Sequence, residues 1–155
     1  MAGLEVRRER IESPLASQLI SELDAELTGR YPEAGATHFR LDAAEVAPGF
    51  GAFFVASIDG EVVGCGAVRR IEDGVAEVKR MYVRTAARDR GIGGAILVAL
   101  ETEARVLGVS RLVLETGVRQ PEALALYRRF GFGVIPPFGE YVKSPLSVCM
   151  AKDLR

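Results

Sequence analysis

The chain has 155 residues, of which 48% are apolar and 26% charged, and its formal net charge is -1. That length predicts a single domain over residues 1–155, and the composition is that of an ordinary folded protein rather than a disordered or fibrous one. A net charge so near zero leaves no protein-wide basic field, so neither nucleic acid nor a membrane is expected as a partner.

The cysteines and the single histidine exclude two classes of small protein. Cys65 and Cys149 lie in apolar segments, where a free thiol behaves as a small buried hydrophobe. With His38 they are too few to predict a disulfide framework or a zinc site, so no metal is expected. The amino-terminal residues lack the apolar core of a secretion signal, and no run reaches the roughly 18 apolar residues of a membrane span. The expected compartment is therefore the cytoplasm.

The first half of the chain predicts a strand, a helix and an antiparallel meander. A strand over 4–9 alternates apolar and charged residues. Ser13 and Pro14 start an amphipathic helix with Leu15, Leu19, Leu23 and Leu27 on one face, and Gly29 can end it. Residues 30–50 predict a loop with a short helix around 42–46. Strands over 52–58, 61–69 and 75–83 follow, separated by turn residues at 59–60 and 72–74.

The second half alternates helices and strands. A helix over 93–107 ends at Gly108 and precedes a strand over 110–116. Pro121 opens a helix over 121–130, and strands over 132–135 and 147–152 complete the chain. A strand–helix–strand connection implies a parallel pair. The predicted fold class is therefore α/β, with a mixed, mostly antiparallel central sheet of six to seven strands and helices on both faces.

A basic, glycine-rich turn joins the strand over 75–83 to the next helix. Gly91, Gly93 and Gly94 leave the backbone open where a helix begins, and the free N–H groups and dipole of a helix start favour an anion. Without a ligand, such a turn could also be a tight connection with solvated arginines. Five basic residues gather here against the single acid Asp89: Lys79, Arg80, Arg84, Arg88 and Arg90.

The turn fits one of three known phosphate-binding patterns. It lacks the Gly-x-x-x-x-Gly-Lys-Ser/Thr string of a P-loop and the spacing of a dinucleotide fingerprint. The segment Arg88-Asp89-Arg90-Gly91-Ile92-Gly93 does match the signature Arg/Gln-x-x-Gly-x-Gly/Ala. A second block, from Gln120 through Tyr127 to Gly131-Phe132, resembles Asn-x-x-Ala-x-x-x-Tyr-x-x-x-Gly-Phe, with Gln in place of Asn. On these blocks, residues 50–152 resemble the GNAT superfamily of acetyl-CoA-dependent N-acetyltransferases, particularly small bacterial members.

The resemblance implies acetyl-CoA as cosubstrate. The backbone amides over 88–94 would hold the pyrophosphate, and the backbone of strand residues near 81–83 would hydrogen-bond the pantetheine arm and supply the oxyanion donors. The implied cofactor-binding residues are Met81, Tyr82, Val83, Arg88, Asp89, Arg90, Gly91, Ile92, Gly93, Gly94, Gln120 and Tyr127.

The resemblance also implies how an amine attacks the thioester. Tyr127 matches the family tyrosine that faces the coenzyme sulfur as general acid, although it could instead be an interfacial aromatic. Two-residue alternation predicts that Glu77 shares a strand face with Lys79, Met81 and Val83. Glu77 and Glu115 are alternative general bases, acting directly or through water, and either could instead form a salt bridge.

The predicted function is transfer of an acetyl group to the primary amine of a small molecule. Aromatic and arginine side chains in the expected acceptor region suit an amino-acid-like amine, with His38 at the rim. A protein amine as acceptor, a CoA-binding module without turnover, and a homodimer remain open. The expected acceptor residues are Tyr31, His38, Phe39, Arg40, Arg69, Phe138, Glu140 and Tyr141.

Overall fold

An antiparallel meander forms the first part of the sheet. The computed structural model describes residues 3–154. Strand β1 (Leu4–Arg8) pairs with β2 (Gly51–Ile58), which pairs with β3 (Glu61–Glu72), which pairs with β4 (Val75–Val83). The turn between β2 and β3 has positive φ at Asp59 (50°) and Gly60 (86°), the backbone twist that a tight hairpin needs. The predicted meander is thereby confirmed.

Helix α1 (Pro14–Arg30) begins where the sequence predicts. The Ser13 hydroxyl accepts a hydrogen bond from the Ala16 N–H at 3.1 Å, and Pro14 occupies the first turn. Leu19 and Leu23 are buried, but Leu15 is 39% exposed, so the buried stripe is one turn shorter than predicted. The loop after α1 contains the short 3₁₀ helix η1 (Ala43–Val46), close to the expected position.

The second half adds parallel and antiparallel strands to the meander. After the 3₁₀ helix η2 (Thr85–Ala87) comes α2 (Ile92–Val106), then β5 (Arg111–Gly117) parallel to β4. Next are α3 (Pro121–Arg129), β6 (Gly133–Ile135), the 3₁₀ helix η3 (Gly139–Tyr141) and β7 (Ser147–Asp153). Strand β7 lies between β5 and β6, giving the order β1-β2-β3-β4-β5-β7-β6. This mixed, mostly antiparallel sheet of seven strands matches the predicted fold class.

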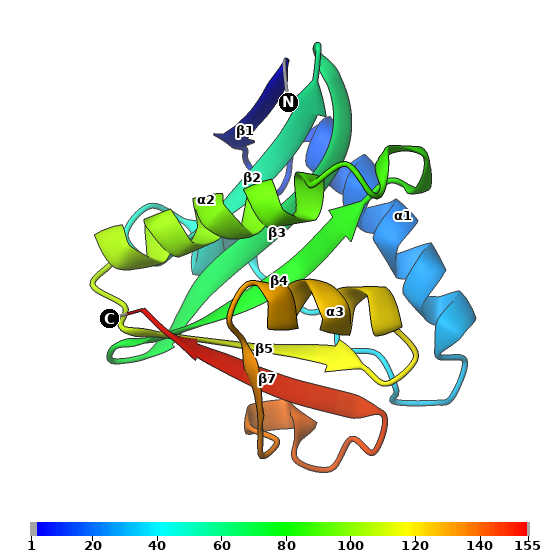
Figure 1. Ribbon diagram of the computed structural model, residues 1–155, viewed down its shortest axis with the longest axis vertical. Coiled ribbons are helices and arrows are strands. Elements are labelled where there is room, and N and C mark those ends of the chain that lie inside the picture. The colour runs from blue at the N-terminus through cyan, green and yellow to red at the C-terminus, as the bar shows by residue number, and fades with distance from the viewer. Residues whose placement is uncertain (1–2, 155) are drawn as a thin grey trace.

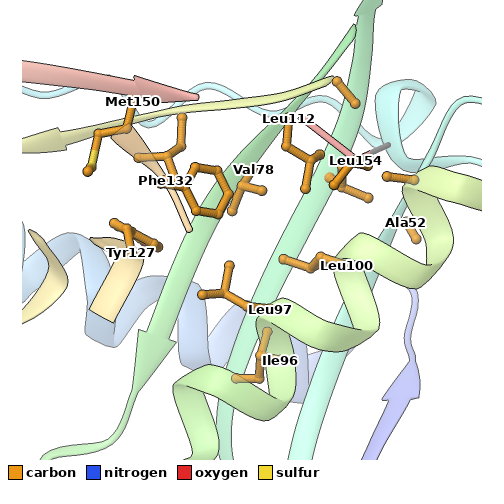
Figure 2. Packing of buried hydrophobic residues seen from close by; sticks show 14 of the residues in the cluster. Ala52, Val78, Ile96, Leu97, Leu100, Leu112, Tyr127, Phe132, Met150 and Leu154 are labelled. Carbon is orange, nitrogen blue, oxygen red and sulfur yellow. The ribbon is translucent and has the colours of Figure 1, made fainter. Parts of the chain in front are cut away.

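Helices cover both faces of the sheet (Figure 1). On the α2 face, Ile96 and Leu100 pack against Val78 and Leu112, and the cluster continues to Tyr127 (Figure 2). On the opposite face, α1 contributes a second apolar cluster that includes Leu19. The two cysteines are buried and free, as predicted. Within residues 3–154, no helix is both long and apolar enough to cross a membrane.

Strands β4 and β5 separate toward their carboxyl ends. Their pairing runs from Val75 opposite Arg111 to Val78 opposite Leu114 and then stops. Figure 1 shows the two strands diverging beyond this point, with the end of β4 running toward the turn before α2. The backbone edge of β4 after Val78 therefore has no strand partner on the β5 side, and its polar groups are available to a ligand.

A β-bulge in β4 changes which side chains share a face. Cys65 and Ala67 on β3 face Tyr82 and Lys79 on β4, so β4 has one extra residue there, and Arg80 has φ 58°. One extra residue reverses the alternation of side chains beyond it.

The bulge corrects the predicted position of Glu77. Val78, Met81 and Val83 pack together in the core under α2, so Glu77 and Lys79 point to the α1 face. The prediction that Glu77 and Lys79 share a face is confirmed. For Met81 and Val83 it is wrong, because simple alternation takes no account of the extra residue.

Candidate active site

Two cavities meet where β4 and β5 separate. The first, the long groove, has a volume of about 190 Å³ and runs along β4, the turn after it, the start of α2 and the exposed side of α3. The second, the inner cavity, has a volume of about 80 Å³ and lies between α1, β4, β5 and the loop that carries Tyr141. Their shared lining residues are Leu23, Met81, Gln120 and Tyr127. The two cavities therefore adjoin at these four residues.

The long groove collects the predicted cofactor-binding residues. All of them line it except Arg90, which is exposed. Gly91 has φ 78°, a left-handed conformation that glycine adopts without steric cost, and it caps the start of α2. A Cβ on Gly93 would lie 3.0 Å from Leu126 Cδ2, so a larger side chain here would extend into the groove.

Gly94 has a different role from Gly93. A Cβ at Gly94 would lie 2.4 Å from Phe130 Cζ, at the contact between α2 and the end of α3. Gly94 thus allows the helix start and Phe130 to pack closely, which shapes the wall of the groove.

The arginines near the turn are already paired with α1. Arg84 Nη2 lies 2.9 Å from Glu22 Oε2, Arg88 Nη2 lies 2.7 Å from Glu26 Oε1, and Arg80 pairs with Asp24. The predicted local excess of positive charge is therefore wrong, since a helix distant in the sequence supplies three carboxylates.

The turn still offers backbone and side-chain donors to the long groove. Arg88 Nε also donates to the Val83 carbonyl at 2.8 Å, which holds the turn against the end of β4. Arg90 and Arg129 make no ion pair within residues 3–154, and Arg129 lines the groove. The free N–H groups at the start of α2 face the same space.

Tyr127 lies at the junction of the two cavities. Its side chain is buried and stands edge-on to Phe132 with ring centroids 5.9 Å apart (Figure 2). Burial, and secondarily the charge of Glu115, raises the pKa of the Tyr127 hydroxyl. This hydroxyl has no hydrogen-bond partner in the described part of the chain. It is therefore a protonated donor that is available to a ligand.

Gln120 shapes the connection between β5 and α3. Its side-chain oxygen accepts a hydrogen bond from the Gly117 N–H at 3.0 Å, and the Tyr31 hydroxyl donates to it at 3.4 Å. The Arg119 N–H in turn donates to the Tyr31 hydroxyl at 2.8 Å. These bonds fix the loop that borders both cavities, so Gln120 has a structural role besides its predicted contact with the cofactor.

Glu77 is held in a buried ion pair. Arg69 donates to Glu77 Oε1 from Nε at 3.1 Å and from Nη2 at 2.9 Å. The Tyr141 hydroxyl donates to Glu77 Oε2 at 2.6 Å, and only 1% of the Glu77 side chain is exposed. Arg69 also pairs with Glu45 of η1. Both carboxylate oxygens of Glu77 are thus occupied by protein donors.

Glu115 has a more open environment. It lies near the end of β5, lines the inner cavity, and accepts a hydrogen bond from the Ser147 hydroxyl at 2.6 Å. Burial raises the pKa of Glu115, while the hydrogen bond from Ser147 acts in the opposite direction. A raised pKa makes this carboxylate a better proton acceptor than an ordinary surface glutamate.

Lys79 places a buried ammonium group beside the inner cavity. Its side chain is 4% exposed, and its contacts are a long hydrogen bond of 3.4 Å to the Tyr141 hydroxyl and Glu140 at 4.0 Å. An ammonium has three donors, so these contacts leave its hydrogen bonding incomplete. The sequence analysis placed Lys79 among the basic residues near the turn and on the strand face of Glu77; the shared face is confirmed, and both side chains line the inner cavity.

The residues expected around an acceptor are only partly brought together. His38 and Tyr141 line the inner cavity, and Tyr31 and Phe39 line a smaller adjoining one. Arg40 is exposed and paired with Asp42, away from the cavities. Glu140 contacts His38 at the outer edge, Phe138 packs edge-on against Tyr141, and Arg69 is bound to Glu77.

The site joins two adjacent cavities at a protonated tyrosine, beside an unpaired strand edge and a helix start. This arrangement is that of an enzyme that brings two substrates together for group transfer. Comparison with known proteins agrees. The model of the acetyltransferase (GNAT) family matches residues 16–132, and the chain belongs to this family of acetyltransferases. No group of three or more metal-ligating side chains occurs within residues 3–154.

Individual relatives extend over the whole chain. IAA acetyltransferase from Azospirillum brasilense is 48% identical over 155 residues, covering 99% of this chain and 100% of that protein. A solved structure from Klebsiella pneumoniae, described as an acyl-CoA N-acyltransferase, is 34% identical with a TM-score of 0.83 and 98% of both chains covered. A GNAT acetyltransferase from Elizabethkingia anophelis, solved with acetyl-CoA bound, shares the fold at 18% identity, with a TM-score of 0.70 and 99% of both chains covered.

Proposed function

We propose that this protein transfers an acetyl group from acetyl-CoA to the primary amine of a small, amino-acid-like molecule. The observation that carries the proposal is the meeting of the long groove and the inner cavity at Tyr127. The acetyl-CoA lies in the groove and supplies an activated thioester. The acceptor lies in the inner cavity. The name of the Azospirillum relative, IAA acetyltransferase, supports acetyl transfer to a specific acceptor.

The groove fits the donor on three counts. The N–H groups at the start of α2 suit a pyrophosphate, and Gly93 keeps a side chain out of its path. The unpaired edge of β4 after Val78 suits the amide groups of the pantetheine arm. Tyr127 Oη keeps its proton because its pKa is raised, and it can give that proton to the departing thiolate.

Among the two carboxylates, Glu115 is the better candidate for the base. Glu77 has both oxygens bound by Arg69 and Tyr141, and taking a proton would disturb a buried ion pair. Glu115 has a raised pKa and faces the same cavity as Tyr127. We assign proton removal from the amine to Glu115 and a supporting role to Glu77.

Lys79 favours an acceptor that carries a carboxylate. Its buried ammonium has donors to spare on the side of the inner cavity, and a carboxylate would complete its hydrogen bonding. An acceptor with a second ammonium in place of the carboxylate would set two like charges side by side. An amino-acid-like molecule can place its amine near Glu115 and its carboxylate near Lys79.

The donor assignment is tested by filling the groove at Gly93. We expect the wild type to bind acetyl-CoA in calorimetry and to release coenzyme A thiol when a suitable amine is added. Gly93→Leu should weaken acetyl-CoA binding at least ~10-fold, because the new side chain occupies the space between Leu126 and Val83. Gly29→Leu on α1, where nothing lies within 4 Å of an added Cβ, is the matched control. Unchanged binding by Gly93→Leu would contradict the donor assignment.

The acceptor assignment is tested with pairs of amines that differ only in the carboxylate. Lys79→Met should raise KM for a free amino acid about 10-fold or more, the effect of losing a charge-assisted hydrogen bond. It should change KM little for the methyl ester of the same amino acid. Steady-state thiol release measures both. Equal effects on acid and ester would refute the role of Lys79, while the transfer reaction itself would stand.

A further inference from the structure

Four hydrogen-bond contacts connect the inner cavity to the surface. Ser147 Oγ donates to Glu115 Oε2 at 2.6 Å and lies 2.7 Å from Ser144 Oγ. Ser144 Oγ lies 3.3 Å from His38 Nε2, and His38 Nδ1 lies 3.2 Å from Glu140 Oε1. The chain begins at a largely buried carboxylate and ends at Glu140, whose side chain is 44% exposed.

We propose that the chain Glu115–Ser147–Ser144–His38 conducts the proton of the acceptor amine from the inner cavity to solvent. The proposal rests on the proposed function, because it gives Glu115 a route to discharge the proton that it removes. Glu115 also lines the smaller adjoining cavity that His38 borders, and its described side-chain hydrogen bond is the one to Ser147, which leads toward His38.

The contact between His38 and Glu140 determines which ring nitrogen of His38 carries the hydrogen. An ionised Glu140 carboxylate can only accept, so His38 Nδ1 carries the hydrogen between them. In the neutral ring, Nε2 is then the bare acceptor that faces the Ser144 hydroxyl. His38 is thus oriented to receive a proton from the inside of the protein.

The transfer is balanced at each step. The ammonium of the acceptor gives one proton to Glu115, which leaves a neutral amine and a carboxylic acid. Once protonated, Glu115 donates to Ser147 Oγ, and the Ser147 hydroxyl turns from Glu115 toward Ser144 Oγ. Glu115 then gives its proton to Ser147 as Ser147 gives its own to Ser144, and Ser144 gives its own to His38 Nε2. The imidazolium gives its Nδ1 proton to bulk water beside Glu140, which leaves the ring hydrogen on Nε2. Proton exchange between the ring and water restores the Nδ1 tautomer, and the hydroxyls turn back.

Several aromatic, charged and titratable groups surround His38, the residue at the end of the proposed relay. Its ring stands edge-on to Tyr141 at 4.9 Å, and Arg80 on the facing strand is neutralised by Asp24. The ammonium of Lys79, which lines the same cavity, and the carboxylate of Glu140 also lie near the ring. The other titratable groups lining cavities next to His38 are Tyr31, Glu33, Glu77, Glu115, Tyr127 and Lys143.

The resting protein offers a direct test, because His38 is the only histidine of the sequence. In tag-free protein labelled with ¹⁵N-histidine, NMR at high pH should show the neutral ring with hydrogen on Nδ1. Ser144→Ala should shift the Nε2 resonance and leave Nδ1 nearly unchanged. A ring with its hydrogen on Nε2 would overturn the relay, whatever the enzyme's activity.

Kinetics give the second test. Ser147→Ala and His38→Ala should each lower kcat roughly 10-fold with unchanged acetyl-CoA binding, as expected for loss of an assisted proton transfer. Ser147→Thr, which keeps the hydroxyl, should restore kcat, and added imidazole should rescue His38→Ala. The control is Ser110→Ala at the start of β5, where the hydroxyl bonds only to the Gly74 carbonyl in the described chain.

The outcomes separate the relay from the proposed function. A wild type that turns over, with His38→Ala equally active and insensitive to imidazole, would overturn the relay alone. A wild type that binds acetyl-CoA but acetylates no amine would overturn the proposed function and the relay with it.

Discussion

Replacing Tyr127 by Phe should lower kcat for acetyl transfer roughly 100-fold, within the range for loss of a general acid. The change removes only a hydroxyl that has no hydrogen-bond partner within residues 3–154, and it keeps the ring that packs on Phe132. The thiolate then leaves without a proton donor. Stopped-flow measurement of thiol release, under conditions where chemistry limits the rate, gives the comparison with wild type.

Two controls keep this result specific. Acetyl-CoA binding and the melting temperature of Tyr127→Phe should match those of wild type, because no buried contact is lost. Tyr31→Phe removes a hydroxyl that bonds to Gln120 and to the backbone of Arg119, so it shows the effect of loosening the same loop while the Tyr127 hydroxyl is kept. A Tyr127→Phe enzyme with wild-type kcat across the pH range would show that another group protonates the thiolate.

Replacing Arg69 by Met should lower the free energy of unfolding by about 3–5 kcal/mol, the usual effect of leaving a buried charge without its partner. Glu77 would keep only the Tyr141 hydroxyl as a donor. Urea unfolding followed by circular dichroism measures the loss. The contact of Arg69 with the more exposed Glu45 should add little.

The double variant separates the pair from the individual side chains. Glu77→Gln combined with Arg69→Met removes the unpaired charge, so it should recover most of the lost stability. If Arg69→Met alone costs less than about 1 kcal/mol, the ion pair is not a structural element of the fold. Glu77→Gln alone also compares the two carboxylates: we expect a smaller loss of kcat than for Glu115→Gln, and the reverse order would return the role of base to Glu77.

The pH dependence of the reaction follows from the raised pKa of Glu115. A base must be deprotonated to act, so activity should fall as the pH drops through the pKa of Glu115. Because that pKa is raised, the loss should occur at a higher pH than for a surface glutamate. In a plot of kcat against pH, this loss of activity on the acidic side should be absent from Glu115→Gln.

The local elements could be predicted because their causes are local. Ser13 and Pro14 start α1 through a cap and a fixed φ, and the Asp59-Gly60 turn suits a hairpin whatever surrounds it. The glycine positions of the turn could also be predicted from the sequence. Gly91 adopts a positive φ and Gly93 leaves space beside Leu126 because neither residue has a side chain.

The charges and side-chain directions of the site could not be predicted in the same way. The bulge at Arg80 is a property of the pairing between β3 and β4, and one extra residue moved Met81 to the face opposite Glu77. The acids that neutralise Arg84 and Arg88 come from α1, far earlier in the chain. Such pairs depend on which elements pack together.

The amino-acid sequence by itself therefore determined the elements, the sheet class, the glycine-rich turn and the family. Only the tertiary structure decided how the carboxylates differ: Arg69 and Tyr141 enclose Glu77, whereas Ser147 links Glu115 to the loop that carries His38. The physical reason is that the pKa and reactivity of a side chain depend on burial, nearby charge and hydrogen bonds, and these come from segments that are distant in the sequence.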